Sequence, residues 1–387
     1  KVKIEREMVK ENPEMAKMEN LSLPVFGTFN HEGEKILIQK FENKYTEMDS
    51  LIRPRNVVII GSDGKRYSFM LKSTEDLRVD QRIMTLFRFM NKFLRTRIKT
   101  YSITPLTVQF GVIQFVENTK RIDDFINESR RRNPDKTPEE IIIKEDYLKP
   151  NDLKEYDNKS DELKRYIFNS IINRTKGYEL YLREALYYIA PDTETWAKYT
   201  VNFTNSCAVT SIVGYIIGIG DRHIKNILMS LIDFADCFEV DQHRRKAPEK
   251  VPFRLTRNIV AMLGPCGING CFRSKCEECL ELIRENRELI FSILEVFYIS
   301  PVQKQAGFRD MRRHMVDIRN ESSKKEFVMK RIKMKLDGTD KTITYDEKNV
   351  GVDNEPMSVQ EHVDRLINCA INPDNLACSF HGWRPWI

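Results

Sequence analysis

Four polar side chains lie close together just past the middle of the chain. Asp221, His223 and Asn226 belong to one short polar run, and Asp233 follows it. Two carboxylates and an amide can supply a base for a hydroxyl group and hard oxygen ligands for Mg²⁺. We therefore expect Asp221 to accept or orient a hydroxyl proton, and Asn226 and Asp233 to bind the metal. His223 is close enough to donate a hydrogen bond to a transferring phosphoryl group, or to hold Asp221.

The same run also has a purely structural interpretation. Residues 221–226 can form a solvated turn between two helices, with Asp233 as a helix cap. An apolar helical pattern over residues 211–217 leads directly into the run, and a second acidic residue follows it. These two features favour the catalytic interpretation, which is phosphoryl transfer.

Phosphoryl transfer also needs a cation to neutralise the phosphates. Lys72 ends an apolar strand pattern over residues 67–71 and is our candidate. Glu75 or Asp80, at the entrance of the next helix, can hold Lys72 by charge pairing. The alternative is a surface lysine at the end of a strand.

The chain has no G-x-G-x-x-G run, which disfavours ordinary protein kinases. We expect residues 49–55 to cover the phosphates instead, with Ser50 and Arg53, through backbone N–H groups and a hydroxyl.

The elements around these residues change from β-rich to helical along the chain. Strand patterns with a helix among them are followed by mainly helical patterns after Arg121; the strands are expected at 35–39, 56–60, 66–71, 100–104 and 111–116, and the helices at about 80–94, 276–298 and 359–370. Polar residues 130–160 predict an inserted surface loop with a short helix, which is a possible docking site. The aromatic end, residues 380–387, is expected to pack on the body.

Length and composition set wider limits. A chain of 387 residues with 41% apolar residues is long enough for two lobes. A net charge of +6 can attract phosphate but does not indicate nucleic-acid binding. The sequence shows no membrane span and no signal-peptide core, so we expect a cytoplasmic location, or a nuclear one.

The eight cysteines suggest reduced thiols. Cys266, Cys271, Cys276 and Cys279 have a spacing that partly matches an iron–sulfur site, so a cluster or zinc is one interpretation. The favoured alternative places Cys276 and Cys279 on the first turns of the helix at 276–298, where small apolar side chains fill core space.

Four separate motifs resemble the phosphatidylinositol-3-kinase-related protein kinases, in the order of that family and over nearly the whole chain. They are the catalytic-loop run at 218–227, the run Pro252-Phe253-Arg254-Leu255-Thr256-Arg257, the lysine strand and helix entry at 72–80, and the C-terminal FATC-like residues 375–376 and 382–386.

The resemblance implies an α+β, bilobal fold of the PI3K type, with a β-rich small lobe (1–113), a hinge (114–118), a helical large lobe (119–336), a linker (337–356) and a FATC segment (357–387). It implies ATP with Mg²⁺, or Mn²⁺, as cofactors. Val116 would bind adenine through its backbone, beside Gln114 and Phe115, and Tyr101 would line the back of the pocket.

Further motifs, among them residues 61–67 and 214–218, are most similar to the branch that acts in nonsense-mediated mRNA decay. This similarity implies transfer to Ser/Thr-Gln sites on an RNA helicase. The helix entry at 75–80 is shared equally by the target-of-rapamycin branch, which implies a growth-control kinase. The resemblance also implies regulatory subunits bound through a helical region before Lys1. Two alternatives remain: a phosphoinositide kinase, with residues 243–246 pairing with a head group, and a pseudokinase scaffold.

The chain departs from the family pattern at two places. Ala235 replaces the commoner glycine after Asp233-Phe234. Only six residues separate Asn226 from Asp233, where the family has a longer hairpin. Either the hairpin is trimmed or residues are missing from the chain. Residues 229–231 leave little room to turn and pair two strands, which favours missing residues, and we expect a second omission after residue 302.

Overall fold

The computed structural model describes most of the chain as two compact units. The described residues are 4–29, 33–47, 53–73, 76–116, 119–149, 152–228, 230–231, 249–299, 321–340 and 355–387. The first unit contains the described residues up to Phe89 together with 99–116 and Thr119, and the second contains residues 90–98 and the described residues from Lys120 to the end. Ser50, Glu75 and Asp233 lie outside the described residues, as do residues 301–320, where the second omission was expected.

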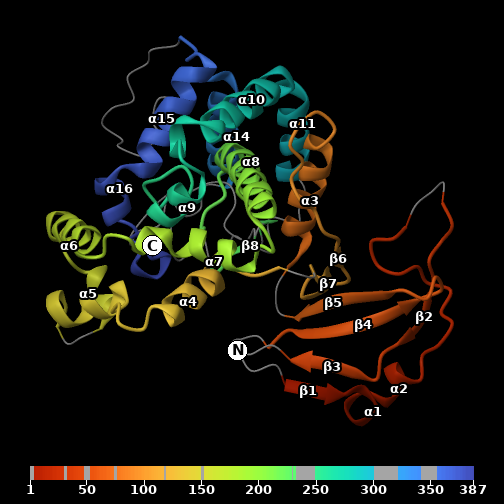
Figure 1. Ribbon diagram of the computed structural model, residues 1–387. Helices are drawn as coiled ribbons and strands as arrows, with labels where there is room; N and C mark the ends of the chain where they lie inside the picture. Colours follow the sequence, from red (N-terminus) through yellow and green to blue (C-terminus); the bar gives the residue numbers. More distant parts are fainter. Residues whose placement is uncertain are drawn as a thin grey trace. The chain divides into compact units, whose positions relative to one another are not determined.

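An antiparallel sheet forms the first unit (Figure 1). Its strand order is β1-β3-β4-β5-β7-β6, and β2 also pairs with β4. The strands are β1 (Ile4–Glu7), β2 (Ile38–Phe41), β3 (Lys44–Glu47), β4 (Arg55–Gly61), β5 (Arg66–Ser73), β6 (Ile103–Pro105) and β7 (Phe110–Gln114). The helices of this unit are α1 (Met8–Glu11), α2 (Pro13–Ala16) and α3 (Arg78–Met90), which enters the second unit at its last residue. The strands expected at 56–60 and 66–71 are confirmed as β4 and β5, which pair as a hairpin through the turn at Asp63-Gly64.

The sheet has one covered face and one half-exposed face. Val57, Ile59, Phe69 and Val112 are buried in a core that residues from the N-terminal segment complete. Successive residues of a strand point to opposite faces, so Met70 and Lys72 lie on the other face. Both of these residues are half-buried.

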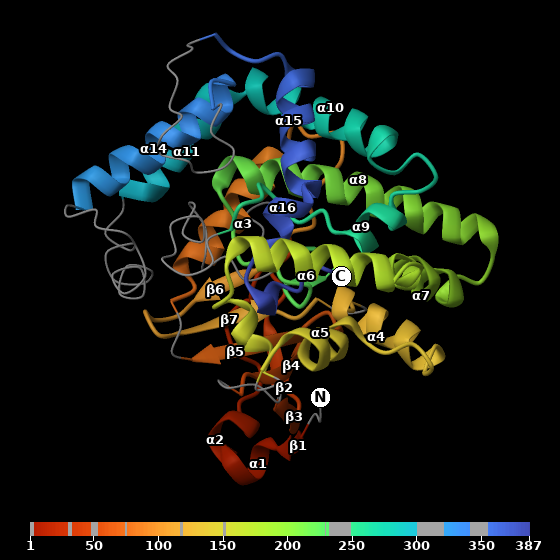
Figure 2. The same ribbon diagram turned by 90° about the vertical axis from the view of Figure 1, so that its left-hand side faces the viewer.

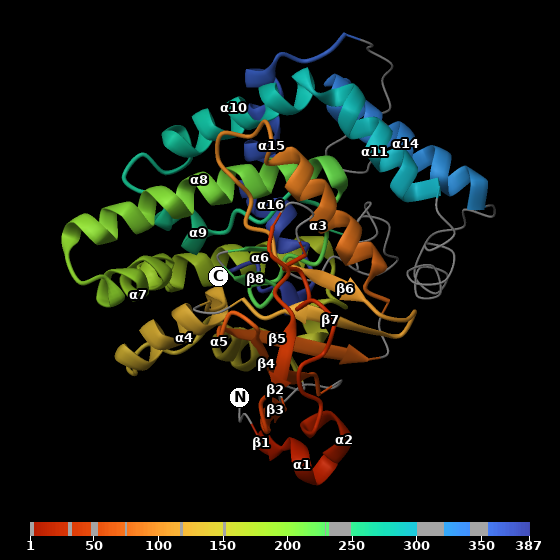
Figure 3. The ribbon, with the colours of Figure 1, turned by 90° about the vertical axis from the view of Figure 1, so that its right-hand side faces the viewer.

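The second unit is helical (Figures 2 and 3). Its helices are α4 (Ile122–Arg132), α5 (Glu139–Tyr147), α6 (Asp161–Arg174), α7 (Tyr181–Ile189), α8 (Thr193–Ile217), α9 (Arg257–Met262), α10 (Cys271–Glu285), α11 (Arg287–Ile299), α14 (Glu321–Asp337), α15 (Val359–Ile371) and α16 (Pro373–Ala377), with 3-10 turns η1 (Leu153–Tyr156), η2 (Tyr178–Leu180), η4 (Gly267–Asn269) and η6 (His381–Trp383). α10 packs along α8, and α15 packs on α10. No helix within the described residues combines the length and apolar character needed to cross a bilayer.

Two expectations for this unit are wrong. Residues 276–298 lie in two helices, because α10 ends at Glu285. The side-chain amide of Asn286, the C-cap residue, donates to the carbonyl of Leu282 at 2.8 Å and so competes with the helical backbone pattern. The short segment after Asn226 does pair two strands, because β8 (Ile227–Leu228) and β9 (Ser230–Leu231) are antiparallel partners.

The polar segment 130–160 is more structured than expected, and it supports the C-terminus. It contains α5 and η1, and Tyr156 at the end of η1 is completely buried. The Tyr156 hydroxyl donates to the carbonyl of Ala377 at 2.6 Å, and its ring meets the Trp386 ring edge-on. Asp157 accepts from the backbone N–H of His381 at 2.9 Å. The prediction that the aromatic end packs on the body is confirmed.

Candidate active site

The catalytic-loop residues follow directly from the end of α8. Gly218 ends this helix with a φ of 62°, a left-handed conformation that glycine adopts without steric cost. The next N–H, of Ile219, returns to the carbonyl of Gly214 at 2.9 Å. The fold therefore delivers residues 220–226 from a capped helix end.

Asp221 has an unusual backbone that its neighbours hold in place. Its φ is 51°, in the left-handed region that non-glycine residues rarely occupy. Its N–H donates to the Glu249 carboxylate at 2.9 Å. The Asn226 amide nitrogen donates to the Asp221 carbonyl at 3.1 Å and to its carboxylate at 3.3 Å. Both halves of Asp221, backbone and side chain, are thus fixed.

His223 is positioned as a neutral hydrogen-bond donor. Its Nδ1 accepts the N–H of Lys225 at 3.2 Å, which places the ring hydrogen on Nε2. Burial lowers the pKa of His223, and the positive charges of Arg222, Arg254 and Lys225 lower it further. Nε2 lies 3.9 Å from the Asp221 carboxylate, beyond hydrogen-bond distance. Of its two predicted roles, donation to a bound group fits this geometry better than holding Asp221.

Arg254 ties the catalytic loop to the C-terminal segment. Its guanidinium donates to the carbonyls of Arg222 at 3.4 Å, Trp383 at 2.6 Å, Arg384 at 3.0 Å and Ile387 at 3.3 Å. It also lies 4.2 Å from the centre of the Trp383 ring, a cation–π contact. Burial lowers the pKa of Arg254 to about 9, so it stays charged at neutral pH.

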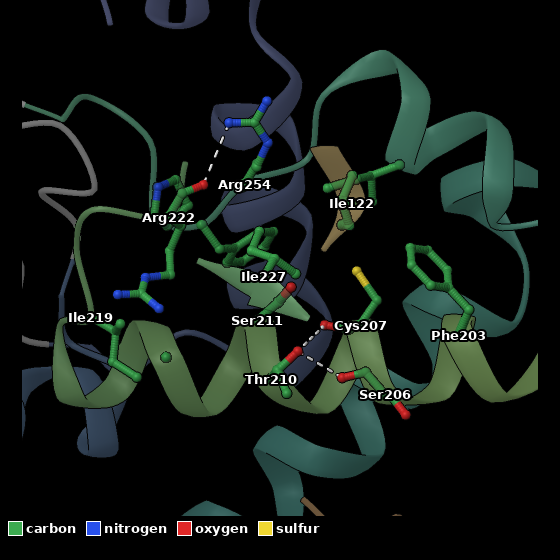
Figure 4. Close-up of a pocket in the computed structure, with 14 residues that line it drawn as sticks. Ile122, Phe203, Ser206, Cys207, Thr210, Ser211, Ile219, Arg222, Ile227 and Arg254 are labelled. Atoms are coloured by element: carbon green, nitrogen blue, oxygen red, sulfur yellow. Dashed lines mark hydrogen bonds between the residues drawn. The ribbon is translucent and has the colours of Figure 1, made fainter. Parts of the chain in front are cut away.

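A small cavity lies between α8 and this loop (Figure 4). Arg222 and Ile219 lie toward one end of it and Phe203 toward the other, with Cys207 between them. Its volume of about 80 Å³ is well below the ~300 Å³ typical of small-molecule sites. It is therefore too small for a nucleotide.

The nucleotide residues predicted from the sequence lie in the first unit. Lys72 is on β5, opposite Gly111 of β7, and shares the half-exposed face of the sheet with Met70. Asp80 lies in the first turn of α3, where an acidic side chain favours the helix dipole. The nearby Asp76 accepts from Arg78 Nε with both carboxylate oxygens, at 2.8 and 3.0 Å.

A second cavity, of about 350 Å³, brings together four of the predicted residues. Tyr101, Gln114, Phe115 and Val116 all line it, whereas Lys72 is not among its lining residues. The Phe115 N–H donates to the carbonyl of Ser68 at 2.8 Å, which joins the end of β7 to β5. The cavity that these four residues line is large enough for a planar heterocycle. Arg53, one of the predicted phosphate contacts, is exposed and has a φ of 43°.

Asn226 is the expected metal ligand that lies in the described part of the chain. Asn226 uses its amide nitrogen on Asp221, which leaves its amide oxygen as the donor for a hard cation. The second expected ligand, Asp233, lies outside the described residues. Within the described ranges, no three His, Cys, Asp or Glu side chains are grouped to hold a metal. The donor chemistry of Asn226 fits Mg²⁺.

The cysteine motif has a structural explanation in its second half. Cys276 and Cys279 are buried on α10, and the Cys276 thiol lies 3.9 Å from the carbonyl of Ala208 on α8. Burial raises the pKa of both thiols. Cys266 and Cys271 are exposed. The placement of the second pair agrees with the core-filling alternative.

Sequence reasoning missed the supporting roles of Glu249 and Arg254. Arg254 belongs to a motif that the sequence singles out, but its partners lie up to 133 residues away. The Glu249 contact spans 28 residues. No local signal points to either role.

Comparisons with known proteins match the chain to a kinase family and its last residues to a separate domain. Residues 66–304 match the family described as phosphatidylinositol 3- and 4-kinase, and residues 356–387 match the FATC domain. The target of rapamycin homolog of Caenorhabditis elegans is 33% identical over 98% of this chain and 15% of its own length. Protein kinase rad3 of Schizosaccharomyces pombe is 31% identical over 89% of this chain and 14% of its own length.

A solved structure shows the same fold. The FAT and kinase domain of CtTel1 superposes with a TM-score of 0.74 at 26% identity, over 95% of this chain and 25% of that one. The chain thus spans only a small part of the relatives it matches. With a kinase-domain match over more than half of its length and a FATC domain at its end, the chain belongs to the phosphatidylinositol-3-kinase-related kinase family.

Proposed function

We propose that the protein transfers the γ-phosphate of ATP to serine or threonine hydroxyls of protein substrates. The observation that carries the proposal is the constrained Asp221, fixed by Glu249 and Asn226 beside the neutral donor His223. The relatives are named as serine/threonine-protein kinases, which supports a protein substrate over a lipid one.

The proposed step uses this chain's side chains as follows. The substrate hydroxyl attacks the γ-phosphorus, the bond to the β–γ bridging oxygen breaks, ADP leaves, and the hydroxyl proton passes to the Asp221 carboxylate. His223 donates its Nε2–H to an oxygen of the transferring group. Lys72 neutralises phosphate charge, with Asp80 near the entrance of its neighbouring helix.

A divalent metal, Mg²⁺ or Mn²⁺, would be held by the amide oxygen of Asn226 and by Asp233. It would supply charge neutralisation on the phosphates. The cavity lined by Gln114, Phe115 and Val116 is our candidate for the adenine ring, with Tyr101 at its back. Ser50, Arg53 and Glu75 remain proposed nucleotide contacts.

For the branch of the family, a target-of-rapamycin type is the first candidate, because relatives of that name are 31–35% identical. The second candidate is a Ser/Thr-Gln kinase that acts on an RNA helicase in mRNA decay. Similar motifs at 61–67 and 214–218 support it. For both candidates we also propose regulatory subunits that bind outside this chain. We further propose a cytoplasmic or nuclear location for either.

The experiment uses the purified protein and its Asp221→Asn variant with Mg-ATP and three acceptors. These are a Ser-Gln peptide, the same peptide with Ala in place of Gln, and phosphoinositide vesicles. We expect peptide phosphorylation that falls about 10²–10⁴-fold in the variant. Preference for the Ser-Gln peptide selects the decay-type candidate, and equal use of both peptides selects the target-of-rapamycin type. Vesicle phosphorylation alone indicates a lipid kinase. Wild-type and variant rates that are equally low indicate a pseudokinase.

A further inference from the structure

Hydrogen bonds between buried polar side chains link α8, α10, α14 and α15, whose ribbons are drawn in Figures 2 and 3. His362 of α15 and Asp340, just after α14, are completely buried, and Tyr215 of α8 is nearly so. Arg284 of α10 and Lys335 of α14 complete the network. Such a group of buried polar side chains is costly unless every member is paired.

The direction of each hydrogen bond in the network follows from chemistry. Arg284 can only donate, so its contact with His362 Nδ1 at 2.8 Å makes Nδ1 an acceptor. The ring hydrogen then sits on Nε2 and donates to the Tyr215 hydroxyl oxygen at 2.9 Å. Tyr215 in turn donates to the Asp340 carboxylate at 3.0 Å. A neutral His362 therefore completes a relay from Arg284 to Asp340.

The environment of His362 keeps it neutral. Burial, together with the positive charges of Arg284, Arg365 and Lys335, lowers its pKa to about 3. The Asp340 carboxylate is paired with Arg331 at 2.5 Å, and Tyr215 stands between it and the imidazole.

A glycine makes room for this arrangement. Gly338, in the turn between α14 and Asp340, has a φ of 77°. A Cβ at this position would lie 2.8 Å from the Arg284 guanidinium carbon. The Arg284 side chain also donates to the carbonyl of Met357 at 2.8 Å, at the start of the FATC domain.

The network acts on the end of α8 that precedes the catalytic loop. Lys335 Nζ donates to the carbonyl of Tyr215 at 2.7 Å and lies 4.6 Å from the centre of its ring. The same carbonyl accepts the N–H of Gly218 at 3.2 Å, in the cap that leads to Asp221. Both the hydroxyl and the carbonyl of Tyr215 are therefore held by residues that follow the catalytic loop in the sequence.

We infer that His362, through Tyr215, is a positioning residue for the catalytic loop, and that the FATC helix fixes the geometry of Asp221 by this relay. The inference rests on the proposed kinase function for its activity readout. It assigns no chemical step to His362, because the contact with the loop runs through Tyr215 and the α8 cap.

The test compares three variants with the wild type. The side chain of His362→Gln still has one hydrogen-bond acceptor and one donor. His362→Phe has an aromatic ring in the same place but can make neither hydrogen bond. Val363→Ala, also fully buried on α15, removes packing without touching the network. At temperatures where all are folded, we expect kcat of the Phe variant to fall about tenfold with an unchanged KM for ATP. The Gln variant should stay within about twofold of the wild type, and so should Val363→Ala.

Hydrogen–deuterium exchange of the peptide that covers residues 218–227 provides a readout independent of catalysis. The N–H groups of Ile219 and Asn226 are hydrogen-bonded at 2.9 and 2.8 Å, so both should be protected. We expect faster exchange in the Phe variant and wild-type exchange in the Gln variant. Equal kcat and exchange in the Phe variant and Val363→Ala would overturn the inference. If the wild type transfers no phosphate, the proposed function fails, and the exchange result alone decides the inference.

Discussion

At the scale of single residues, the left-handed backbone of Asp221 is the feature that needs most support. Such a conformation costs about 1–2 kcal/mol for an L-residue. It persists here because Glu249 accepts the Asp221 N–H at 2.9 Å and Asn226 binds its carbonyl. Strain of this kind tends to concentrate at functional sites, where the surroundings fix it.

Replacing Glu249 should therefore misplace the base. We expect Glu249→Ala to lower kcat about 10–100-fold, because the Asp221 N–H loses its acceptor and the loop can relax. Glu249→Gln keeps a carbonyl oxygen and should lose less than about threefold. Steady-state kinetics with a peptide substrate measure both. A Glu249→Ala enzyme with wild-type kcat would show that the contact does not hold the loop.

The sequence identifies Asp221, His223 and Asn226 because their side-chain types carry the chemistry and their spacing is local. Glu249 and Arg254 cannot be found in this way. Their roles come from contacts made across 28 and up to 133 residues, and an isolated acidic or basic residue gives no sign of its distant partner. The neutral state of His223 likewise depends on burial and on three cationic neighbours.

At the scale of elements, the sequence predicts which segments form strands and amphipathic helices better than it predicts the residues at which they end. The hairpin β4–β5 and helix α3 lie close to their predicted positions. The sequence does not predict the break between α10 and α11 or the tight pair β8–β9. The break depends on one side-chain hydrogen bond of Asn286, and β8–β9 depends on a very short backbone pairing, neither of which a periodic pattern encodes.

The contact between η1 and α16 provides a test at this scale. Tyr156→Phe removes a buried hydroxyl that donates to the carbonyl of Ala377. We expect the free energy of unfolding to fall by about 1–3 kcal/mol, since a buried carbonyl loses its partner. Tyr166→Phe on the neighbouring α6 is the control, because Tyr166 is 63% exposed and its change should stay within about 0.5 kcal/mol. Urea unfolding measures both, and equal losses would contradict the assignment.

The four cysteines around the start of α10 should differ in reactivity. Burial raises the pKa of Cys276 and Cys279, whereas Cys266 and Cys271 are exposed. In the native protein we expect an alkylating reagent to modify the exposed pair about a hundredfold faster or more, because the thiolate is the reactive form. Mass spectrometry of the labelled peptides measures the rates. Protection of all four that is lost on chelation would favour a bound metal instead.

At the scale of the whole molecule, the C-terminal FATC domain is part of the core of the second unit. Trp386 and Ile387 are buried, and Arg254 binds the backbone of the last residues. The aromatic composition of this end predicts that it packs. Its specific partners, Tyr156 and Arg254, could not be predicted because the segments that carry them lie more than 100 residues away.

Because the FATC domain is part of this core, its buried His362 makes the stability of the second unit depend on pH. Its pKa is about 3 when folded and close to 6.5 in an unfolded chain, so below pH 6.5 the unfolded state binds one more proton than the folded state. The stability contribution is therefore complete above pH 6.5 and is lost as the pH falls toward 3, by about 1.4 kcal/mol per pH unit. Between pH 7.5 and 5 the loss amounts to about 2 kcal/mol.

His362→Gln isolates this contribution, because glutamine keeps both hydrogen bonds but does not titrate. Urea unfolding of the wild type and the variant at several pH values from 7.5 to 5 gives two stability curves, and all other titrating groups cancel in their difference. We expect the wild-type curve to fall more steeply below pH 6.5, by about 1.4 kcal/mol per unit at the lower end. Parallel curves would mean that His362 is protonated in the folded protein. The Arg284 contact could not then be a hydrogen bond to Nδ1, and the relay to Tyr215 would lose its starting point.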